Sequence, residues 1–206
     1  IPAALFVITS DDIRRSGAAS LPEALRLAPG VQMARIDGSR WASGVRGFAD
    51  RLSRAMLVLI DGRAVYSPLF SGTYWEVQDV LLEDVDRIEV IKGPGGTLWG
   101  ANAVNGVINI ILKDASQTRS PLVAGEAGED GQFMTAVRAG GGRDGLAYRV
   151  YGKAQQHAHE LRDTTAGTDG SRLGQAGARV DWSRPGGQSM TLQGDVYVAR
   201  LGELAV

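Results

Sequence analysis

The feature that most constrains this chain is a change in its hydrophobic pattern near residue 115. Upstream, short apolar runs are separated by polar segments that carry glycine and proline. Downstream, apolar and polar side chains alternate residue by residue, which is the period of a β-strand with two unlike faces. We therefore expect two domains, 1–115 and 116–206. The alternation is clear over 146–155, 175–182 and 189–198, and weaker over 132–139 and 122–128.

The first part predicts an α+β domain, a small mixed sheet with short helices. Strands are expected where short apolar runs are bounded by turn residues. The run 56–66 contains Asp61-Gly62, a strong hairpin turn, and is expected to form two strands. We expect strands near 5–9, 31–35, 57–60, 87–92 and 107–112, with Leu59, Ile88, Val90, Ile108 and Ile110 buried at the centre.

One helix is predicted in this part, over residues 21–28. Ser20 is followed three residues later by Glu23, which is the spacing of a capping box. Pro29 and Gly30 give a clear signal for the end of the helix. The polar stretch 11–17, DDIRRSG, is expected only to end the preceding strand.

The second part is compatible with two kinds of sheet. Segments of about ten residues with one apolar face are required of strands in a transmembrane β-barrel. A soluble antiparallel sheet with one solvated face has the same period. The connections favour the barrel, because 141–145 and 184–187 are short and 156–173 is long. Outer-membrane barrels pair short periplasmic turns with longer outer loops. We expect one apolar face that includes Leu146, Val150, Ala178, Val180, Leu192 and Val196.

Composition excludes several classes of function. The 22 Lys and Arg nearly balance the 23 Asp and Glu, so nucleic-acid binding is not expected. The chain has no cysteine, which removes disulfides and thiolate metal sites. Its longest apolar runs, 3–8 and 55–60, are far shorter than the roughly 20 residues of a membrane-spanning helix. The 28 glycines favour turns and close backbone approaches.

No catalytic constellation is recognisable, and the chain is not expected to be an enzyme. The glycine-rich loop is not a nucleotide site, because Lys92 precedes its glycines and Leu98 occupies the third glycine position of the dinucleotide pattern. His157 and His159 lie two residues apart and are weak candidates for metal or ligand contact. No resident metal or cofactor is expected.

Four ordered motifs carry a resemblance to a known family. They are ITSDDIRRSGAASLPEALRLAPGV (8–31), VRGF (45–48), VLIDGRAV (58–65) and RIEVIKGPGGTLWGANAVNGVINIILK (87–113). Together they resemble the plug domain of TonB-dependent outer-membrane receptors. The resemblance implies an α+β plug over 1–115, threaded inside a barrel of the 22-stranded plugged type. Residues 116–206 would supply about five antiparallel strands of that barrel, which this chain contains only in truncated form.

The resemblance also implies a function, partners and a location. A member of this family imports a bulky, scarce nutrient across the outer membrane of a Gram-negative bacterium, and a ferric siderophore is the first expectation. Haem, cobalamin and oligosaccharide remain open. TonB and its inner-membrane energising complex would pull on an N-terminal box, which is expected to lie outside this sequence. Outer-membrane lipid would surround the barrel. The alternative is a soluble ligand-binding or adhesion module with a β-sandwich, which needs a second apolar sheet face.

Site residues follow from the same motifs. Family plugs carry two basic residues that pair with barrel glutamates, and these fall on Arg46 and Lys92. These pairs would hold the plug in the lumen, and we call them the lock. Arginine is frequent at the second position, and Lys92 lacks the guanidinium fork, so a weaker lock is expected. The alternative is that both residues are ordinary surface charges. Arg87 and Glu89 are expected to be structural. The signature loop comprises Gly93, Pro94, Gly95, Gly100, Asn102 and Gly106.

An aromatic segment, 66–77, follows the predicted hairpin. Its position resembles the outward-facing apices of family plugs, which touch ligand. Aromatic surfaces suit iron chelates and planar ligands, although the same side chains could instead pack the plug against the barrel. The candidate ligand contacts are Tyr66, Phe70, Tyr74 and Trp75.

Overall fold

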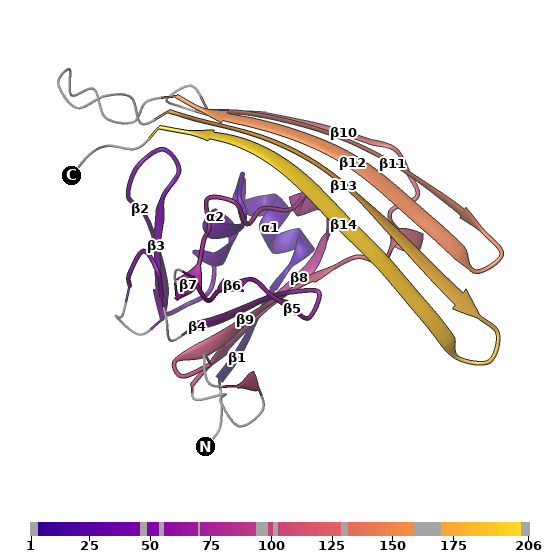
Figure 1. Ribbon diagram of the computed structural model, residues 1–206, viewed down its shortest axis with the longest axis horizontal. Helices are drawn as coiled ribbons and strands as arrows, with labels where there is room; N and C mark the ends of the chain where they lie inside the picture. Colours follow the sequence, from indigo (N-terminus) through magenta and orange to yellow (C-terminus); the bar gives the residue numbers. More distant parts are fainter. Residues whose placement is uncertain are drawn as a thin grey trace. The chain divides into compact units, whose positions relative to one another are not determined.

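The computed structural model shows a mixed α/β unit followed by an antiparallel sheet (Figure 1). Contacts between Cα atoms divide the chain into two units. The first comprises residues 1–36 and 40–112, and the second comprises residues 37–39 and 113–206. Neither described helix approaches the length and apolar character needed to cross a membrane. The structure describes residues 4–45, 49–53, 56–69, 71–93, 99–100, 103–128, 132–158 and 170–202.

The first unit is built on a five-stranded sheet in the order β1-β8-β9-β4-β5. Strand β4 pairs in parallel with β9, and the other neighbours are antiparallel, so the sheet is mixed as expected. Two small hairpins, β2–β3 and β6–β7, lie outside this sheet. The strands are β1 Ala4–Thr9, β2 Val31–Arg35, β3 Trp41–Val45, β4 Met56–Ile60, β5 Arg63–Ala64, β6 Tyr66–Ser67, β7 Gly72–Thr73, β8 Val85–Lys92 and β9 Gly106–Leu112.

The predicted hairpin turn after β4 is confirmed. Asp61 and Gly62 both adopt positive φ angles, 47° and 76°. This is the conformation that a two-residue turn of type I′ requires. The turn brings Arg63 back opposite Ile60.

The helices differ from the prediction in two respects. Helix α1, Ser10–Ser16, occupies the polar stretch that was expected only to end β1. Its capping box joins Thr9 and Asp12. The Thr9 hydroxyl donates to Asp12 Oδ2 at 2.6 Å and accepts from the Asp12 amide at 3.2 Å. The hydrogen bond that the Thr9 hydroxyl donates to the carboxylate lowers the pKa of Asp12.

The capping box predicted at Ser20 is wrong. Helix α2, Leu21–Leu25, begins after Ser20, but the Ser20 side chain makes no capping bond. Glu23 still reaches back, and its Oε2 accepts from the Ala19 amide at 2.8 Å. The helix ends at Leu25, short of Ala28, so the stop signal at Pro29 closes a looser turn that follows it.

The predicted centre of the first unit is confirmed as buried. Ile88, Val90, Ile108 and Ile110 are inaccessible in the main core cluster. That cluster also contains α2, because Leu21 and Leu25 pack against the same face of the sheet. Leu59 is buried in a smaller cluster with Leu57, Ala103 and Val107. Both faces of the sheet are therefore covered, which explains the continuous apolar run of β4.

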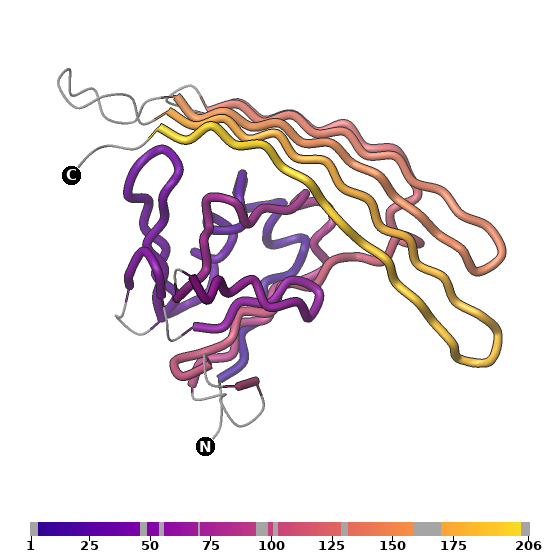
Figure 2. Tube along the Cα trace, viewed as in Figure 1, coloured from indigo at the N-terminus to yellow at the C-terminus, as the bar shows by residue number. Residues whose placement is uncertain are grey.

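The second unit is a single antiparallel sheet in the order β10-β11-β12-β13-β14. It forms a long curved surface and does not close on itself (Figure 1). The turns after β11 and after β13 are tight and lie at the same end of the sheet (Figure 2). The strands are β10 Leu122–Ala127, β11 Phe133–Arg143, β12 Leu146–His157, β13 Ser171–Arg184 and β14 Gln188–Leu201.

The predicted apolar face of the second unit is confirmed by the strand register. Val150 lies opposite Ala178, Val180 opposite Leu192, and Ala176 opposite Val196, so these side chains share one face. The face is open in this structure, since Leu192 and Val196 remain 65% and 72% exposed. We call it the outward face. The opposite face carries the polar set, including Arg149, Lys153, Gln175, Arg179 and Asp181.

Candidate functional site

Two parts of the structure carry candidate functional residues: the motif loops of the first unit, and the segment that begins the second. Lys92 ends β8 opposite Gly106, the first residue of β9. Its ammonium group donates to the carbonyl oxygen of Pro29 at 2.9 Å. Lys92 thus stabilises the turn after α2 in this structure. Arg46, its predicted companion in the lock, lies outside the described residues.

Gly106 shows why the signature needs a glycine at this position. A Cβ atom here would lie 2.6 Å from the carbonyl oxygen of Ile91, closer than real side chains approach. Gly93 and Gly100 have φ angles of 126° and 96°, which residues with a Cβ rarely adopt. These three positions therefore require glycine. Pro94, Gly95 and Asn102 lie outside the described residues.

The predicted structural role of Arg87 and Glu89 agrees with their contacts. Arg87 Nε donates to Glu89 Oε1 at 2.8 Å, and Nη1 donates to Asp86 Oδ2 at 2.6 Å. These bonds, first the one to Glu89, raise the pKa of Arg87. Glu89 also accepts from Asn109 on β9 at 3.1 Å. The polar face of β8 is therefore paired within the sheet.

The aromatic segment separates into buried and accessible side chains. Trp75 is a member of the buried core, so packing accounts for it in this structure. Tyr66 and Tyr74 are half-buried. The Tyr74 hydroxyl accepts from Arg51 at 3.1 Å, and the Arg51 guanidinium lies 5.6 Å from its ring centroid. Phe70 lies outside the described residues.

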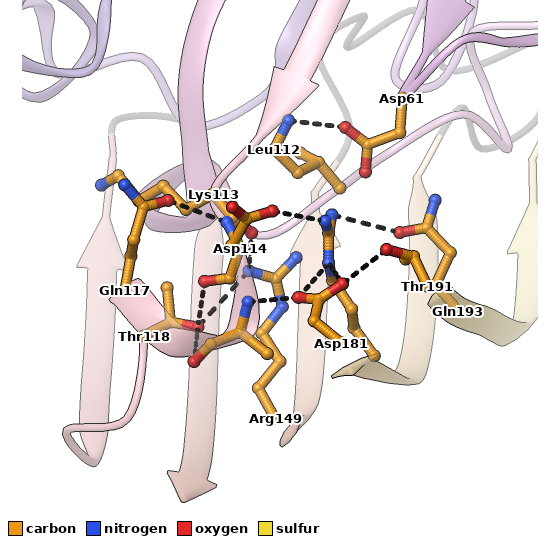
Figure 3. Close-up of polar contacts among 12 residues, drawn as sticks. Asp61, Leu112, Lys113, Asp114, Gln117, Thr118, Arg149, Asp181, Thr191 and Gln193 are labelled. Carbon is orange, nitrogen blue, oxygen red and sulfur yellow. Dashed lines mark hydrogen bonds and ion pairs between the residues drawn. The ribbon is translucent and has the colours of Figure 1, made fainter. Parts of the chain in front are cut away.

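The polypeptide leaves the first unit through a short, strongly bonded segment, residues 113–118, which we call the junction (Figure 3). Just before it, Asp61 Oδ1 accepts from the Leu112 amide at 2.8 Å and so ends β9. The junction then forms a 3₁₀ turn, Ala115–Gln117. Asp114 caps this turn, and its own amide donates to Gln117 Oε1 at 2.9 Å.

Side chains from β12 and β13 hold the junction (Figure 3). Arg149 Nη1 donates to the Lys113 carbonyl at 2.7 Å. Arg179 Nη2 donates to Asp114 Oδ1 at 2.8 Å. Asp181 accepts from the Ala115 amide at 2.6 Å, and also from Arg179 Nε at 2.8 Å. Arg179 is thereby paired with two carboxylates, and Arg149 binds a backbone carbonyl oxygen.

Burial makes these junction bonds energetically significant. Arg149 and Arg179 are only 4% and 8% exposed, and Thr118 is almost fully buried. Charge-assisted hydrogen bonds out of water are roughly twice as strong as neutral ones. The junction also packs very closely on β11, because a Cβ atom at Gly140 would lie 2.6 Å from the Thr118 carbonyl oxygen. The arrangement fixes a backbone segment.

The histidine candidates gain no support as a metal site. His157 is half-buried at the end of β12, and His159 lies outside the described residues. The part of the chain that the structure describes contains no group of three potential metal ligands. His157 instead lines a hollow of about 370 Å³ at this end of the sheet, with Gln156, Ser171, Arg172 and Arg200 among its neighbours.

Sequence reasoning missed the junction residues. The alternating pattern does place Arg149, Arg179 and Asp181 on the polar face of their strands, which was a usable signal. It does not reveal their partners, because Ala115 and Asp181 are 66 residues apart. Only the strand register brings these groups together.

Comparison with known proteins gives a consistent result. The family model of the TonB-dependent Receptor Plug Domain matches residues 1–107. The vitamin B12 transporter BtuB of Vibrio vulnificus is 33% identical over 132 residues, which cover 63% of this chain and 21% of the relative. The ferric enterobactin receptor of Pseudomonas aeruginosa is 29% identical over 210 residues, covering 91% of this chain and 28% of the relative.

A solved structure shows the same fold. The ferric yersiniabactin uptake receptor FyuA of Yersinia pestis superposes with a TM-score of 0.75 at 19% sequence identity. The match covers 96% of this chain and 32% of that receptor. The chain thus spans between a fifth and a third of the length of the proteins that it matches.

Proposed function

This chain belongs to the TonB-dependent receptors, and from that premise we propose that its parent protein imports a bulky, scarce nutrient across the outer membrane. A ferric siderophore is the first candidate cargo. The observation that carries the proposal is the pairing of a plug-domain match over 1–107 with an antiparallel sheet that exposes one apolar face. Cobalamin is the second candidate, since a relative at 33% identity is named a vitamin B12 transporter.

In this proposal residues 1–115 form the plug and residues 116–206 begin the barrel. The outward face of β10–β14 meets lipid, and the polar face lines the lumen, as alternation in a membrane barrel requires. The relatives are transporters and receptors, and the proposed protein performs no chemical conversion. Its parent lies in the outer membrane, with the long connection between β12 and β13 on the outer side.

The order of strands suggests how a pull could open the plug. Strand β1 is both the first strand in the chain and an edge strand of the sheet, bonded only to β8 among the strands described. TonB acting N-terminal to β1 would therefore detach an edge strand before it disturbs the central pair β8–β9. Further along the chain, where the second unit begins, the junction is held by Arg149, Arg179 and Asp181 of the same unit. The plug sequence would thus be pulled from its N-terminal side and followed by a segment that is fixed to the second unit.

Lys92 and Arg46 remain the proposed lock between the plug and the barrel. Lys92 already donates to the Pro29 carbonyl, so a barrel carboxylate would share an ammonium that has three donors. Tyr66 and Tyr74 remain proposed ligand contacts, because both are partly accessible. Trp75 would support them from the core.

Uptake measurements test the proposal. The full-length gene is expressed in an outer-membrane receptor-deficient strain, with and without TonB. Cells are supplied with radiolabelled ferric enterobactin, ferric yersiniabactin or cobalamin. We expect accumulation of one ligand that depends on TonB and saturates with concentration. Equal accumulation of all three without TonB would indicate passive leakage and contradict the proposal.

A further inference from the structure

The outward face of β13 is an apolar strip with an arginine at each end. Arg172 and Arg184 lie twelve positions apart on that face, with small and apolar side chains between them. At about 3.3 Å per residue and a strand tilt near 40°, this separation is roughly 30 Å along the membrane normal. Both arginines therefore fall at the depth of lipid headgroups. The residues between them are Gly174, Ala176, Ala178, Val180 and Trp182.

The two ends of this strip are not alike. Arg172 lies directly opposite Arg200 on β14, and both are exposed. Like charges in directly opposite positions destabilise a sheet. No ion pair or side-chain hydrogen bond reaches either arginine from the residues that the structure describes. At the other end, Arg184 lies opposite the neutral Gln188. The arginine pair is thus a concentrated positive charge that an anion would relieve.

An apolar hollow lies further along the strands from this arginine pair. A hollow of about 480 Å³ lies in the sheet surface, and most of its lining residues belong to the outward face. Gly174 and Val198, two positions along from Arg172 and Arg200, are among them. Glycine and alanine are five of its lining residues, and Val137 and Val196 are among the larger ones. The arginine pair, which we call the clamp, therefore lies beside an apolar hollow, which we call the groove.

We propose that Arg172 and Arg200 bind a phosphate group of lipopolysaccharide, with one of its acyl chains lying in the adjoining groove. Two guanidinium forks match phosphate geometry and tolerate the membrane interface. The source of the phosphate rests on the proposed function, which places this end of the sheet, with its long connection, in the outer leaflet. Gln156, opposite Arg172 on β12, offers an amide donor beside the same phosphate.

Native mass spectrometry of the full-length receptor in detergent tests the inference. The probes are diphosphorylated lipid A, the same lipid without phosphate, phosphatidylglycerol and inorganic phosphate. We compare the wild type with R172Q/R200Q, with R172K/R200K and with R184Q as the matched control. We expect R172Q/R200Q to weaken lipid A binding by at least roughly tenfold, as the loss of charge-assisted hydrogen bonds implies. R172K/R200K should be intermediate, and R184Q should change binding less than about twofold, as expected of a surface site outside the clamp.

Several results would overturn the inference. They are equal binding of dephosphorylated lipid A, equal binding of phosphatidylglycerol, competition by inorganic phosphate at similar concentrations, or an equal loss in R184Q. Folding of each variant is checked by its resistance to unfolding in detergent. Nutrient uptake is measured in parallel. A receptor that binds lipid A but imports nothing would contradict the proposed function alone, whereas normal uptake without lipid A selectivity would contradict this inference alone.

Discussion

Strands β4 and β14 show how differently the two units use β-structure. All five residues of β4 are buried, because α2 and loops cover one face of its sheet and a second cluster covers the other. Nearly all of β14 is exposed, although its outward face carries Met190, Leu192, Val196 and Val198. A continuous apolar run is typical of a strand whose sheet is covered on both faces within its own unit. Strict alternation belongs to a sheet whose apolar face needs a partner outside the unit.

The largest expected difference is in solubility. The outward face exposes a broad apolar surface, and β14 is a long unpaired edge. We expect the chain 1–206 to aggregate in plain buffer and to become monodisperse in detergent, as measured by light scattering. A version ending at residue 115 should remain monomeric without detergent. Monodisperse behaviour of 1–206 in plain buffer would contradict the membrane origin of the second unit.

Truncation of an apolar side chain should cost several kcal/mol of stability in the first unit and very little in the second. Ile108→Ala removes a fully buried side chain from the first unit and should cost about 2–5 kcal/mol. Val196→Ala removes an exposed methyl pair from the second and should change stability by less than about 0.5 kcal/mol. Thermal unfolding of the detergent-solubilised chain measures both. Equal losses would mean that the second unit has a protein-packed face on its outward side.

Substitution of a residue that holds the junction should cause an intermediate loss of stability. Asp181→Asn removes the carboxylate that pairs with Arg179 and accepts from the Ala115 amide. We expect a loss of about 1–3 kcal/mol and faster hydrogen exchange across 113–118. The control, Asp195→Asn, changes an exposed carboxylate on β14 and should leave that exchange unchanged. If both variants exchange alike, the junction is not anchored by Asp181.

The proposed lock should have the smallest effect. Arg46→Ala in the full-length receptor should loosen the plug by on the order of 1 kcal/mol, because lumen water weakens a buried pair. The readouts are hydrogen exchange over 45–66 and leakage of small antibiotics. Lys92→Arg should tighten the plug or do nothing, because it retains the charge and adds a fork. If Arg46→Ala shows wild-type hydrogen exchange, leakage and uptake, the lock assignment is wrong and both residues are ordinary surface charges.

The sequence predicted most of the strands because their apolar runs are local signals. Strands β1, β4, β8 and β9 were recognisable for that reason, and so was the turn at Asp61-Gly62. Helix α1 was missed because its cap, Thr9, is also the last residue of β1. Ser20 shows the opposite error, since a matching capping pattern formed no side-chain bond. Local patterns therefore constrain elements better than they constrain individual hydrogen bonds.

The candidate site was less predictable because its contacts are long-range. Arg149 and Arg179 looked like ordinary residues of a polar strand face. Their role becomes visible only when register places them beside Lys113 and Asp114. Trp75 was missed as a core residue because its segment has no regular period. These contacts and the burial of Trp75 depend on strand register and packing, which composition and motif spacing do not show.

The most direct test of the account is a reversible cross-link between β1 and β8. Leu5 lies opposite Ile91, and directly opposed residues of an antiparallel pair are close enough for a disulfide. The chain has no cysteine to compete with an engineered L5C/I91C pair. The control pair, A34C/A42C, joins β2 to β3 and leaves β1 free.

Ligand binding and uptake are then measured in cells before and after reduction. If energy-coupled transport detaches β1, oxidised L5C/I91C should bind ligand normally and import almost none, and reduction should restore uptake. Oxidised A34C/A42C should import at close to the wild-type rate. Uptake by oxidised L5C/I91C at the wild-type rate would contradict the central claim that this unit is a plug opened from its N-terminal edge strand.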